Sequence, residues 1–304
     1  MERVLVIGGA GFIGSHTVEA LLAEGATVRV LDNLSAGKAD NLPLDNSSLE
    51  FVEGDIRDAD TVASALNGVS HCLHLAAQVS VVNSLEDPRN SADQNILGFV
   101  TVLEAARRAD VTRFVYASSA AVYGDPVELP LTENVEPRPL SPYSVEKWVN
   151  EHYANLFQHL YDVSALGLRY FNVYGPRQDS KSPYAGVIAL FVDRIREKMP
   201  LSVFGDGRQT RDFIYVGDVA RANMAALRGD ATGVSNVATG HTVTLLELIA
   251  TLDKLCGVKS DVNFLPPREG DIAHSAGDPS HMHEVLNMKA ETALSAGLSN
   301  LLFS

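Results

Sequence analysis

The sequence predicts an α/β fold in which a doubly wound parallel sheet is joined to a smaller C-terminal lobe. Short β-branched runs alternate with longer helical patterns in the first half of the chain, which is typical of a parallel sheet covered by helices on both faces. The first run leads directly into the glycine-rich stretch Gly8-Gly9-Ala10-Gly11-Phe12-Ile13-Gly14. At 304 residues the chain also exceeds the usual size of one domain, so we expect two closely joined lobes.

Local patterns justify each expected element in order along the chain. Runs rich in β-branched and aromatic residues predict strands at 3–7, 27–31, 50–53, 71–75, 113–117 and 164–169. Between them, apolar residues at helical spacing predict helices at 13–24, 60–66, 94–109 and 143–160. Beyond residue 171 the alternation weakens, and 176–186 and 266–278 are expected to be long ordered loops of the kind that bind ligands.

We therefore expect a dinucleotide-binding lobe at residues 1–171 and a mainly substrate-binding lobe at 172–304, with segments near 217–239 returning to the first sheet.

Composition argues against several classes of function. A formal net charge of -14 opposes a nucleic-acid surface, which needs a basic field. No apolar run approaches the roughly 20 residues that span a bilayer, and the N-terminus carries no export signal, so no membrane association and a cytoplasmic location are expected. Cys72 and Cys256 lie far apart in apolar stretches, which predicts two reduced core thiols. His281 and His283 alternate on an expected helix and face different ways, so we expect no metal site.

The glycine-rich stretch predicts a dinucleotide site of the Rossmann type. Gly8, Gly11 and Gly14 permit a tight turn, close approach of a pyrophosphate, and close packing of helix on strand. Asp32 ends the next expected strand, where a carboxylate accepts hydrogen bonds from an adenosine ribose and repels a 2′-phosphate. This favours NAD over NADP. Asp55 either clamps the adenine edge or caps an acidic turn, and a structural turn without ligand is the alternative for the whole set.

Tyr143 and Lys147 are the expected centre of the chemistry. A tyrosine has a free pKa of about 10 and is a poor base near neutral pH. A lysine one helical turn later places an ammonium beside the phenol, which favours the phenolate and turns the tyrosine into a proton acceptor.

Further motifs are spread over nearly the whole chain. They are Gly8-x-x-Gly11-x-x-Gly14, Asp55-Ile56, His74-Leu75-Ala76-Ala77, Ser118-Ser119-Ala120-Ala121-Val122-Tyr123-Gly124, Tyr143-x-x-x-Lys147 and Arg169-Tyr170-Phe171-Asn172-Val173-Tyr174-Gly175-Pro176-Arg177. In combination they make the chain resemble the extended short-chain dehydrogenase/reductases, and especially the NAD-dependent nucleotide-sugar 4-epimerases.

The resemblance implies a reversible epimerisation at C4′ of a UDP-sugar. The Tyr143 phenolate takes the 4′-hydroxyl proton while C4′ passes hydride to tightly bound NAD, and the 4-ketose then turns to receive the hydride on its other face. Ser119 bonds the same substrate oxygen, with Ser118 as the second candidate, and Lys147 also bonds the nicotinamide ribose. The implied cofactor contacts are Gly8, Gly11, Phe12, Ile13, Gly14, Asp32, Asn33, Asp55, Ile56, Leu75, Ala76, Ala77, Tyr143, Lys147 and Tyr170.

The resemblance also implies a substrate site. Besides Ser119 its members are Asn172, Val187, Val203, Arg211, Arg268, Asp271 and Ser275. Arg211, Arg268 and Asn172 clamp the diphosphate, because guanidinium groups donate paired hydrogen bonds to phosphate. Val187 and Val203 line the uracil pocket, and Asp271 contacts the uridine end.

The residue at position 275 bears on which sugars are accepted. A tyrosine there excludes a 2′ N-acetyl group, whereas the small Ser275 leaves room for it. UDP-N-acetylglucosamine and UDP-N-acetylgalactosamine are therefore the expected pair, with UDP-glucose and UDP-galactose as further substrates and a place in polysaccharide biosynthesis.

The same family resemblance bears on which other activities are possible and on the assembly state of the protein. Ala120 and Ala121 replace the acid-base pair that dehydratases of this superfamily carry, so elimination of water is not expected. A UDP-uronic acid 4-epimerase, a nucleotide-sugar reductase and a non-catalytic NAD-binding scaffold stay open as alternatives. The apolar faces of the helices at 94–109 and 143–160 predict a homodimer through a four-helix interface.

Overall fold

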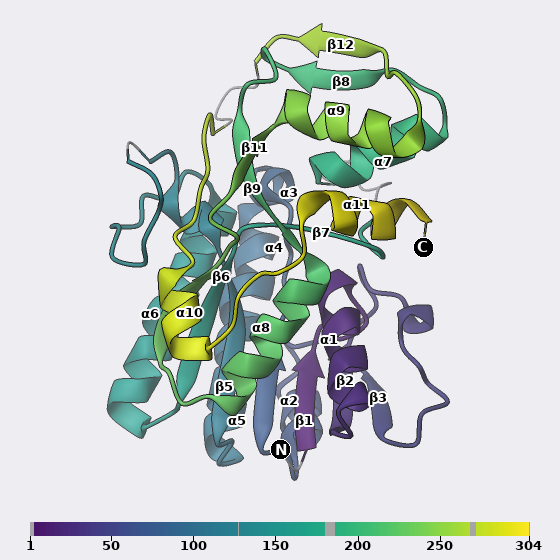
Figure 1. Cartoon of the computed structure of the whole chain (residues 1–304). Coiled ribbons are helices and arrows are strands. Elements are labelled where there is room, and N and C mark those ends of the chain that lie inside the picture. The colour runs from purple at the N-terminus through teal and green to yellow at the C-terminus, as the bar shows by residue number, and fades with distance from the viewer. Residues whose placement is uncertain (1–2, 127, 180–185, 268–271, 304) are drawn as a thin grey trace.

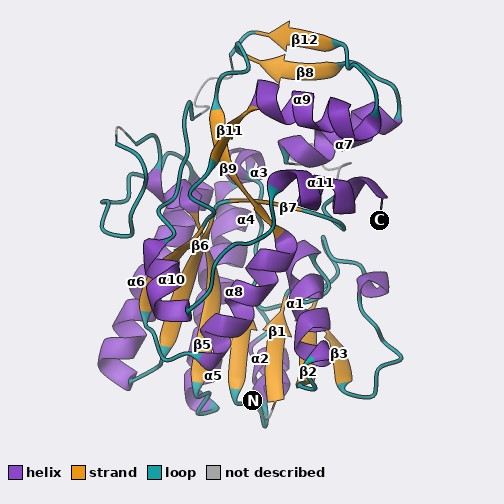
Figure 2. Cartoon of the chain, in the orientation of Figure 1, coloured by secondary structure: helices purple, strands orange, loops and turns teal. Residues whose placement is uncertain are grey.

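A seven-stranded sheet, parallel throughout, forms the larger lobe of the computed structural model, which describes residues 3–126, 128–179, 186–267 and 272–303 (Figures 1 and 2). The strand order is β10-β6-β5-β4-β1-β2-β3. The strands are β1 (Arg3–Ile7), β2 (Thr27–Asp32), β3 (Leu49–Glu53), β4 (His71–His74), β5 (Arg113–Ser119), β6 (Ala165–Tyr170) and β10 (Gly233–Val237). The winding direction reverses between β1 and β4, and ligands of such sheets bind at the carboxyl ends of the strands beside that reversal. The predicted doubly wound sheet is confirmed.

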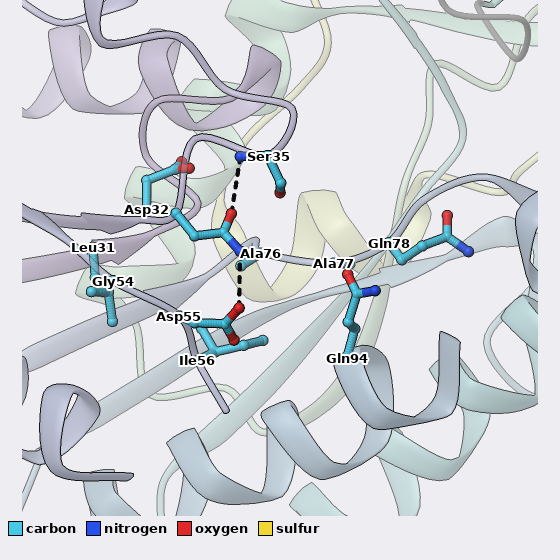
Figure 3. A pocket seen from close by; sticks show the side chains of 11 residues that line it. Leu31, Asp32, Ser35, Gly54, Asp55, Ile56, Ala76, Ala77, Gln78 and Gln94 are labelled. Atoms are coloured by element: carbon cyan, nitrogen blue, oxygen red, sulfur yellow. Dashed lines mark hydrogen bonds between the residues drawn. The ribbon is translucent and has the colours of Figure 1, made fainter. Parts of the chain in front are cut away.

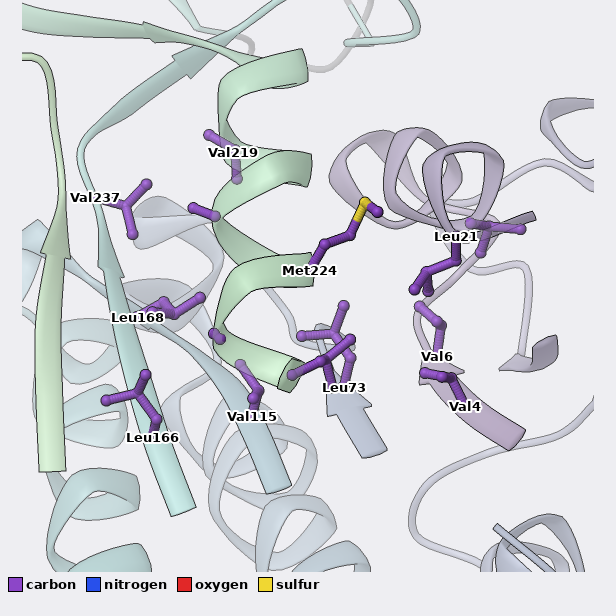
Figure 4. Close-up of a cluster of buried hydrophobic side chains, with 14 of the residues drawn as sticks. Val4, Val6, Leu21, Leu73, Val115, Leu166, Leu168, Val219, Met224 and Val237 are labelled. Atoms are coloured by element: carbon purple, nitrogen blue, oxygen red, sulfur yellow. The ribbon is translucent and has the colours of Figure 1, made fainter. Parts of the chain in front are cut away.

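Helices cover both faces of this sheet because its strands are apolar on both faces. Val4 and Val6 of β1 lie in one buried cluster, whereas Leu5 and Ile7 point to the opposite face and lie in a second cluster. Figure 4 shows the first cluster, in which Met224 and Val219 pack between the sheet and the neighbouring helices. The helices of that face are α1 (Phe12–Ala23), α8 (Val216–Arg228) and α10 (Ser280–Leu286). Those of the other face are α2 (Ala59–Leu66), α5 (Gly98–Arg108) and α6 (Pro142–Tyr161).

The smaller lobe lies beyond the carboxyl ends of the large sheet (Figure 1). Its strands form a three-stranded sheet, ordered β11-β9-β7, and a separate pair, β12-β8. A third buried apolar cluster holds them against three helices. The elements are β7 (Asn172–Tyr174), α7 (Val187–Arg196), β8 (Leu201–Phe204), β9 (Thr210–Tyr215), β11 (Thr242–Thr244), α9 (Leu245–Cys256), β12 (Val262–Leu265) and α11 (Leu294–Phe303).

The chain crosses between the lobes several times. After β9 it runs into α8, which packs against α1, and then into β10, which pairs with β6 in the large sheet. The two lobes are thus built from interleaved segments of the chain.

The expected elements of the first half are present, with one change of geometry. The predicted helix at 94–109 starts with a π-helical turn, η2 (Asp93–Leu97), before α5 begins. The side chain of Asn95 in this turn bonds the backbone of Gln78 in the loop after β4. Helical periodicity could not predict this contact, because it joins residues 17 positions apart in the sequence. The remaining short elements are η1 (Ala39–Asn41), α3 (Val81–Glu86), α4 (Pro88–Ala92) and η3 (Ala120–Tyr123).

The cysteines only partly match the expectation of two core thiols. Cys72 is fully buried in β4, but Cys256 is half-buried at the end of α9, because that end of the helix reaches the surface. Both are free thiols.

Candidate active site

The turn between β1 and α1 leaves no space for a side chain at Gly8 or Gly14. Gly8 has a φ of +80°, and a Cβ there would lie 2.6 Å from the backbone nitrogen of Ala76. A Cβ on Gly14 would collide with the carbonyl oxygen of Gly8. The N-terminus of α1 has no side-chain cap, so the first backbone N–H groups of the helix point out of the turn, beside Phe12 and Ile13. This arrangement fits a pyrophosphate, which helix N-termini bind through backbone donors and the helix dipole.

A polar pocket beside this turn has the shape and chemistry of an adenosine site (Figure 3). Asp32 braces it, because its carboxylate accepts hydrogen bonds from the backbone nitrogens of Ala10 (2.9 Å) and Leu34 (2.8 Å). The pocket is lined by Leu31, Asp32, Asn33, Ser35, Gly54, Asp55, Ile56, Ala76, Ala77, Gln78 and Gln94. Five lining residues were not predicted as cofactor contacts, although Gln78 directly follows the motif that ends at Ala77: Leu31, Ser35, Gly54, Gln78 and Gln94.

The charges around the pocket favour NAD. Asn33 donates to a carboxylate oxygen of Asp55 (3.2 Å), and this contact is drawn in Figure 3. Arg57 makes ion pairs with Asp55 (2.7 Å) and Asp93 (3.0 Å), and its guanidinium holds the pKa of the Asp55 carboxyl well below the usual range. The carboxylates of Asp55 and Asp93 neutralise the positive charge of Arg57, so this arginine is not free to bind a 2′-phosphate. The carboxylate of Asp32 would repel such a phosphate. The pocket therefore suits the unphosphorylated ribose of NAD.

Two of the expected cofactor residues, Tyr170 and Leu75, pack their side chains against the first buried cluster. Tyr170 is buried in the first cluster, where its hydroxyl donates to Asn223 (2.6 Å). Leu75 lies under the glycine turn and packs against the same cluster, and its backbone nitrogen donates to Ile7. Neither side chain is among those that line the pocket.

The start of α6 positions Tyr143 and Lys147. Ser141 caps the helix in a capping box with Ser144, and Pro142 occupies the first turn, so the helix begins at a defined residue. The Ser119 side chain, at the end of β5, lies beside the Tyr143 hydroxyl and acts on its pKa. The ammonium of Lys147 lies 5.8 Å from the centre of the Tyr143 ring. The three residues predicted to be catalytic thus meet at the carboxyl edge of the sheet.

The two neighbouring serines are in different environments. Ser118 is buried and donates to Glu151 (2.5 Å), which in turn pairs with Arg169 (2.7 Å). The hydroxyl of Ser119 accepts a bond from the backbone of Ala121 (3.1 Å) and is half-buried. Ser119 therefore faces Tyr143, whereas Ser118 belongs to the buried ion-pair network.

The electrostatics differ from the expectation that Lys147 alone favours the phenolate. Burial raises the pKa of Tyr143, the neighbouring Ser119 hydroxyl partly opposes the rise, and the Glu146 carboxylate adds to it. The ammonium of Lys147 donates to the carbonyl oxygen of Ala117 (3.0 Å) instead of reaching the phenol. Burial also lowers the pKa of Lys147 to about 8. Desolvation, which a sequence does not display, is the largest cause of both shifts.

The expected substrate residues that the structure describes lie on the smaller lobe and at its junction with the large sheet. Asn172 is exposed at the start of β7. Arg211 on β9 donates to the carbonyl oxygens of Thr210 (2.9 Å) and Ala273 (3.4 Å). The backbone of Ser275 donates to Thr210 (3.1 Å), and Thr210 pairs in parallel with His274. Residues that follow paired positions point to the other face, so Arg211 and Ser275 are neighbours on one face. Arg268 and Asp271 lie outside the described residues.

The expected uracil contacts are only partly placed as predicted. Val187 is half-buried at the first turn of α7. Val203 is a correction, because its side chain is fully buried in the core of the smaller lobe and has no exposed surface to offer. Strand β8 alternates buried and half-buried positions, so the next residue, Phe204, faces an open groove instead. The groove is lined by Phe204, Gly205, Asp206, Arg208, Gln209, Phe264, Leu265, Pro267, Ile272, Ala273 and His274.

Other ionisable groups near the site have a structural role. His74 is buried against Phe99 and Phe114, and burial together with the Lys147 charge lowers its pKa to about 3, so it stays neutral. Among the described residues no group of three or more His, Cys, Asp or Glu side chains is placed to hold a metal ion.

Comparison with known proteins adds to this geometry. Residues 4–238 match the sequence profile of the NAD dependent epimerase/dehydratase family. The UDP-glucose 4-epimerase of Mycolicibacterium smegmatis is 41% identical, over 98% of this chain and 96% of that protein. A UDP-N-acetylglucosamine 4-epimerase from Methanobrevibacter ruminantium, solved with UDP-N-acetylmuramic acid, superimposes with a TM-score of 0.96 at 37% identity, covering 99% of this chain and 97% of that one. A Thermus thermophilus UDP-glucose 4-epimerase in complex with NAD gives a TM-score of 0.91 at 39% identity, with coverage of 99% and 97%.

Proposed function

The chain belongs to the NAD dependent epimerase/dehydratase family, and we propose that it interconverts UDP-sugars by inverting C4′ with the help of tightly bound NAD. One observation carries this proposal. The Tyr143 hydroxyl and the neighbouring Ser119 side chain lie at the same sheet edge as the glycine turn and the adenosine pocket. A proton acceptor and a hydride acceptor can therefore act on one carbinol centre.

NAD, when bound, supplies the acceptor that takes hydride from C4′ and later returns it. Tyr143 removes the proton of the 4′-hydroxyl and gives it back when the alcohol re-forms. Ser119, which lies beside Tyr143, bonds the same substrate oxygen and keeps it in line with the phenol. Lys147, charged near neutral pH, bonds the nicotinamide ribose and favours the phenolate.

Inversion requires the sugar to turn while the nucleotide stays in place. We assign the diphosphate clamp to Arg211, Arg268 and Asn172, with Asp271 at the uridine end. Arg211 is anchored through two backbone carbonyls, so its guanidinium is oriented in advance. Phe204 replaces Val203 in the proposed uracil site and acts together with Val187.

An assay with UDP-glucose, UDP-galactose, UDP-N-acetylglucosamine and UDP-N-acetylgalactosamine tests the function. We expect chromatography to show interconversion within each pair without added NAD. UDP-glucuronate in the same assay tests the uronic acid alternative, and accumulation of reduced cofactor tests the reductase. If NAD-loaded protein interconverted none of the four sugars, the proposed function would be wrong, and the non-catalytic NAD-binding scaffold would be favoured.

Replacing Ser275 by Tyr should separate the two sugar pairs. A tyrosine ring beside Arg211 would fill the space next to the sugar 2′ substituent, where only the acetylated pair carries a bulky group. We expect kcat/KM for the acetylated pair to fall by about 100-fold while the plain hexoses keep theirs within about threefold. Ser275→Ala is the matched control and should spare both pairs. Equal loss for both pairs in Ser275→Tyr would contradict the gate.

We further propose a homodimer through α5 and α6. Val145, Tyr153, Leu156 and Leu160 form one exposed apolar stripe along α6, opposite its buried face. Leu97, at the start of α5, adds a further exposed apolar side chain.

Leu156→Glu should convert the dimer to a monomer in sedimentation experiments, because it places a charge within the apolar interface. Leu44, equally exposed at 52% against 48% for Leu156, lies in a remote loop. Leu44→Glu should leave the mass unchanged, and a monomeric unaltered protein would refute the proposed interface.

The division of labour between the lobes and the cellular setting are proposals of the same kind. We assign NAD binding to residues 1–171, with 217–239 completing the sheet, and substrate binding mainly to residues 172–304. None of the helices in the described part of the chain is long and apolar enough to cross a membrane. The free thiols Cys72 and Cys256 suit the reducing cytoplasm, where the products would supply polysaccharide biosynthesis.

A further inference from the structure

Glu146 is a buried carboxylate inside the motif that carries the chemistry. Only 2% of the residue is exposed, and it directly precedes Lys147. One carboxylate oxygen, Oε2, accepts hydrogen bonds from the hydroxyl of Ser91 (2.9 Å) and the amide of Asn95 (2.6 Å). The other oxygen, Oε1, has no hydrogen-bond partner among the described residues. Burying a carboxylate with one unpaired oxygen costs free energy, so packing alone does not explain why Glu146 is there.

The two donors connect Glu146 to the cofactor pocket. Asn95 lies in the π-helical turn η2 and bonds Gln78 twice, through its amide nitrogen (2.8 Å) and its carbonyl oxygen (2.8 Å). Gln78 lines the adenosine pocket. Asn150, one turn further along α6, donates to the backbone oxygen of Asn95 (2.9 Å). Glu146 thus lies at the point where the helix with Tyr143 and Lys147 is fixed to the loop beside the cofactor.

Glu146 also acts on the charges of the site. Lys147 is only 4% exposed, and its ammonium donates a hydrogen bond to the neutral carbonyl of Ala117. The titratable groups that face it are Tyr143 and Glu146 on α6 and His74 on β4. The Glu151 carboxylate near this helix is paired with Arg169 and is compensated there. The negative charge of Glu146 raises the pKa of Lys147 and also that of Tyr143.

We propose that Glu146 is a positioning residue for the epimerase reaction. Its carboxylate keeps Lys147 in the ammonium form and fixes the first turns of α6 against η2 and the Gln78 loop. The inference rests on the proposed function, because it assigns Glu146 a part in the work of Tyr143 and Lys147. Glu146 does not touch the substrate in this scheme.

Glu146→Gln tests the role of the charge, since glutamine keeps an acceptor for Ser91 and Asn95 and removes the negative charge. Activity needs a deprotonated Tyr143 and a protonated Lys147, so the two limbs of the pH profile report the ionisation of these two groups. Loss of the carboxylate lowers both pKa values, so both limbs should move to lower pH by about one unit. Glu146→Asp keeps the charge, so both limbs should lie at the same pH as in the unaltered protein, even where kcat is reduced.

A second readout does not depend on turnover. Ultraviolet difference titration of tyrosinate, with Tyr143→Phe versions of each protein subtracted, follows Tyr143 directly. We expect this tyrosine to ionise at lower pH in Glu146→Gln than in the unaltered chain. Thermal unfolding of each variant shows whether the fold is kept.

Glu151→Gln is the matched control, because it removes the other buried carboxylate of α6 and breaks the pairing with Arg169. It should reduce stability without moving either pH limb. A Glu146→Gln protein with unmoved limbs and unmoved tyrosinate titration would overturn the inference, as would an equal shift in Glu151→Gln. An unaltered chain that turns over none of the UDP-sugars would refute the proposed function instead, while the tyrosinate titration would still report on Glu146.

Discussion

Tyr143→Phe should lower the rate of UDP-sugar epimerisation by about 10³-fold, because the reaction loses the group that accepts and returns the 4′-hydroxyl proton. The change removes one hydroxyl beside Ser119 and leaves the bond between Lys147 and Ala117 in place. We therefore expect NAD content and thermal stability to stay close to those of the unaltered protein. Chromatographic measurement of kcat on the four UDP-sugars, with bound NAD determined in parallel, checks both expectations.

Tyr153→Phe is the control for this variant. It removes the same hydroxyl from the exposed side of the same helix, away from Ser119. Its turnover should equal that of the unaltered protein. If Tyr143→Phe kept more than about a tenth of the original kcat, another group would have to be the principal acid-base residue.

Gly14→Ala should abolish NAD binding and destabilise the fold by about 3 kcal/mol, since the added methyl collides with a backbone atom. The obstacle is the carbonyl oxygen of Gly8, which cannot move aside easily. The Gly8 nitrogen donates to Leu31 (2.8 Å), and its carbonyl accepts from Gly11 (3.2 Å). Urea unfolding with and without NAD measures both effects, because a ligand that binds only the folded state raises the apparent stability.

Gly11→Ala provides a graded comparison at the same turn. Its added Cβ would lie 3.2 Å from the same carbonyl oxygen, and its backbone conformation is open to any residue. We expect its stability to stay within about 1 kcal/mol of the unaltered protein, with weaker NAD binding where the pyrophosphate approaches the backbone. Retention of NAD and an unchanged unfolding midpoint in Gly14→Ala would show that the turn relaxes and that the steric account is wrong.

The sequence predicted the elements well where the signal is local. Strands β1 to β6 and helices α1, α2 and α6 lie within two residues of the predicted bounds, because hydrophobic periodicity and glycine punctuation act over a few residues. The prediction differed at η2, where Asn95 bonds Gln78 and Glu146. It also differed at Val203, whose neighbour Phe204 faces the groove, because a four-residue strand does not reveal which of its faces is buried.

Local sequence alone was enough to predict the glycine turn, the carboxylate of Asp32 at the end of β2, and the spacing that brings Tyr143 and Lys147 onto one helical face. Each of these depends on the chemistry of neighbouring residues. Three other features became visible only in the folded chain. They are the burial that shifts the pKa values of Tyr143 and Lys147, the bond from Lys147 to Ala117, and the bonds from Ser91 and Asn95 to Glu146. Burial and long-range hydrogen bonds arise when segments distant in the chain pack together, and these set the pKa values on which the proposed chemistry depends.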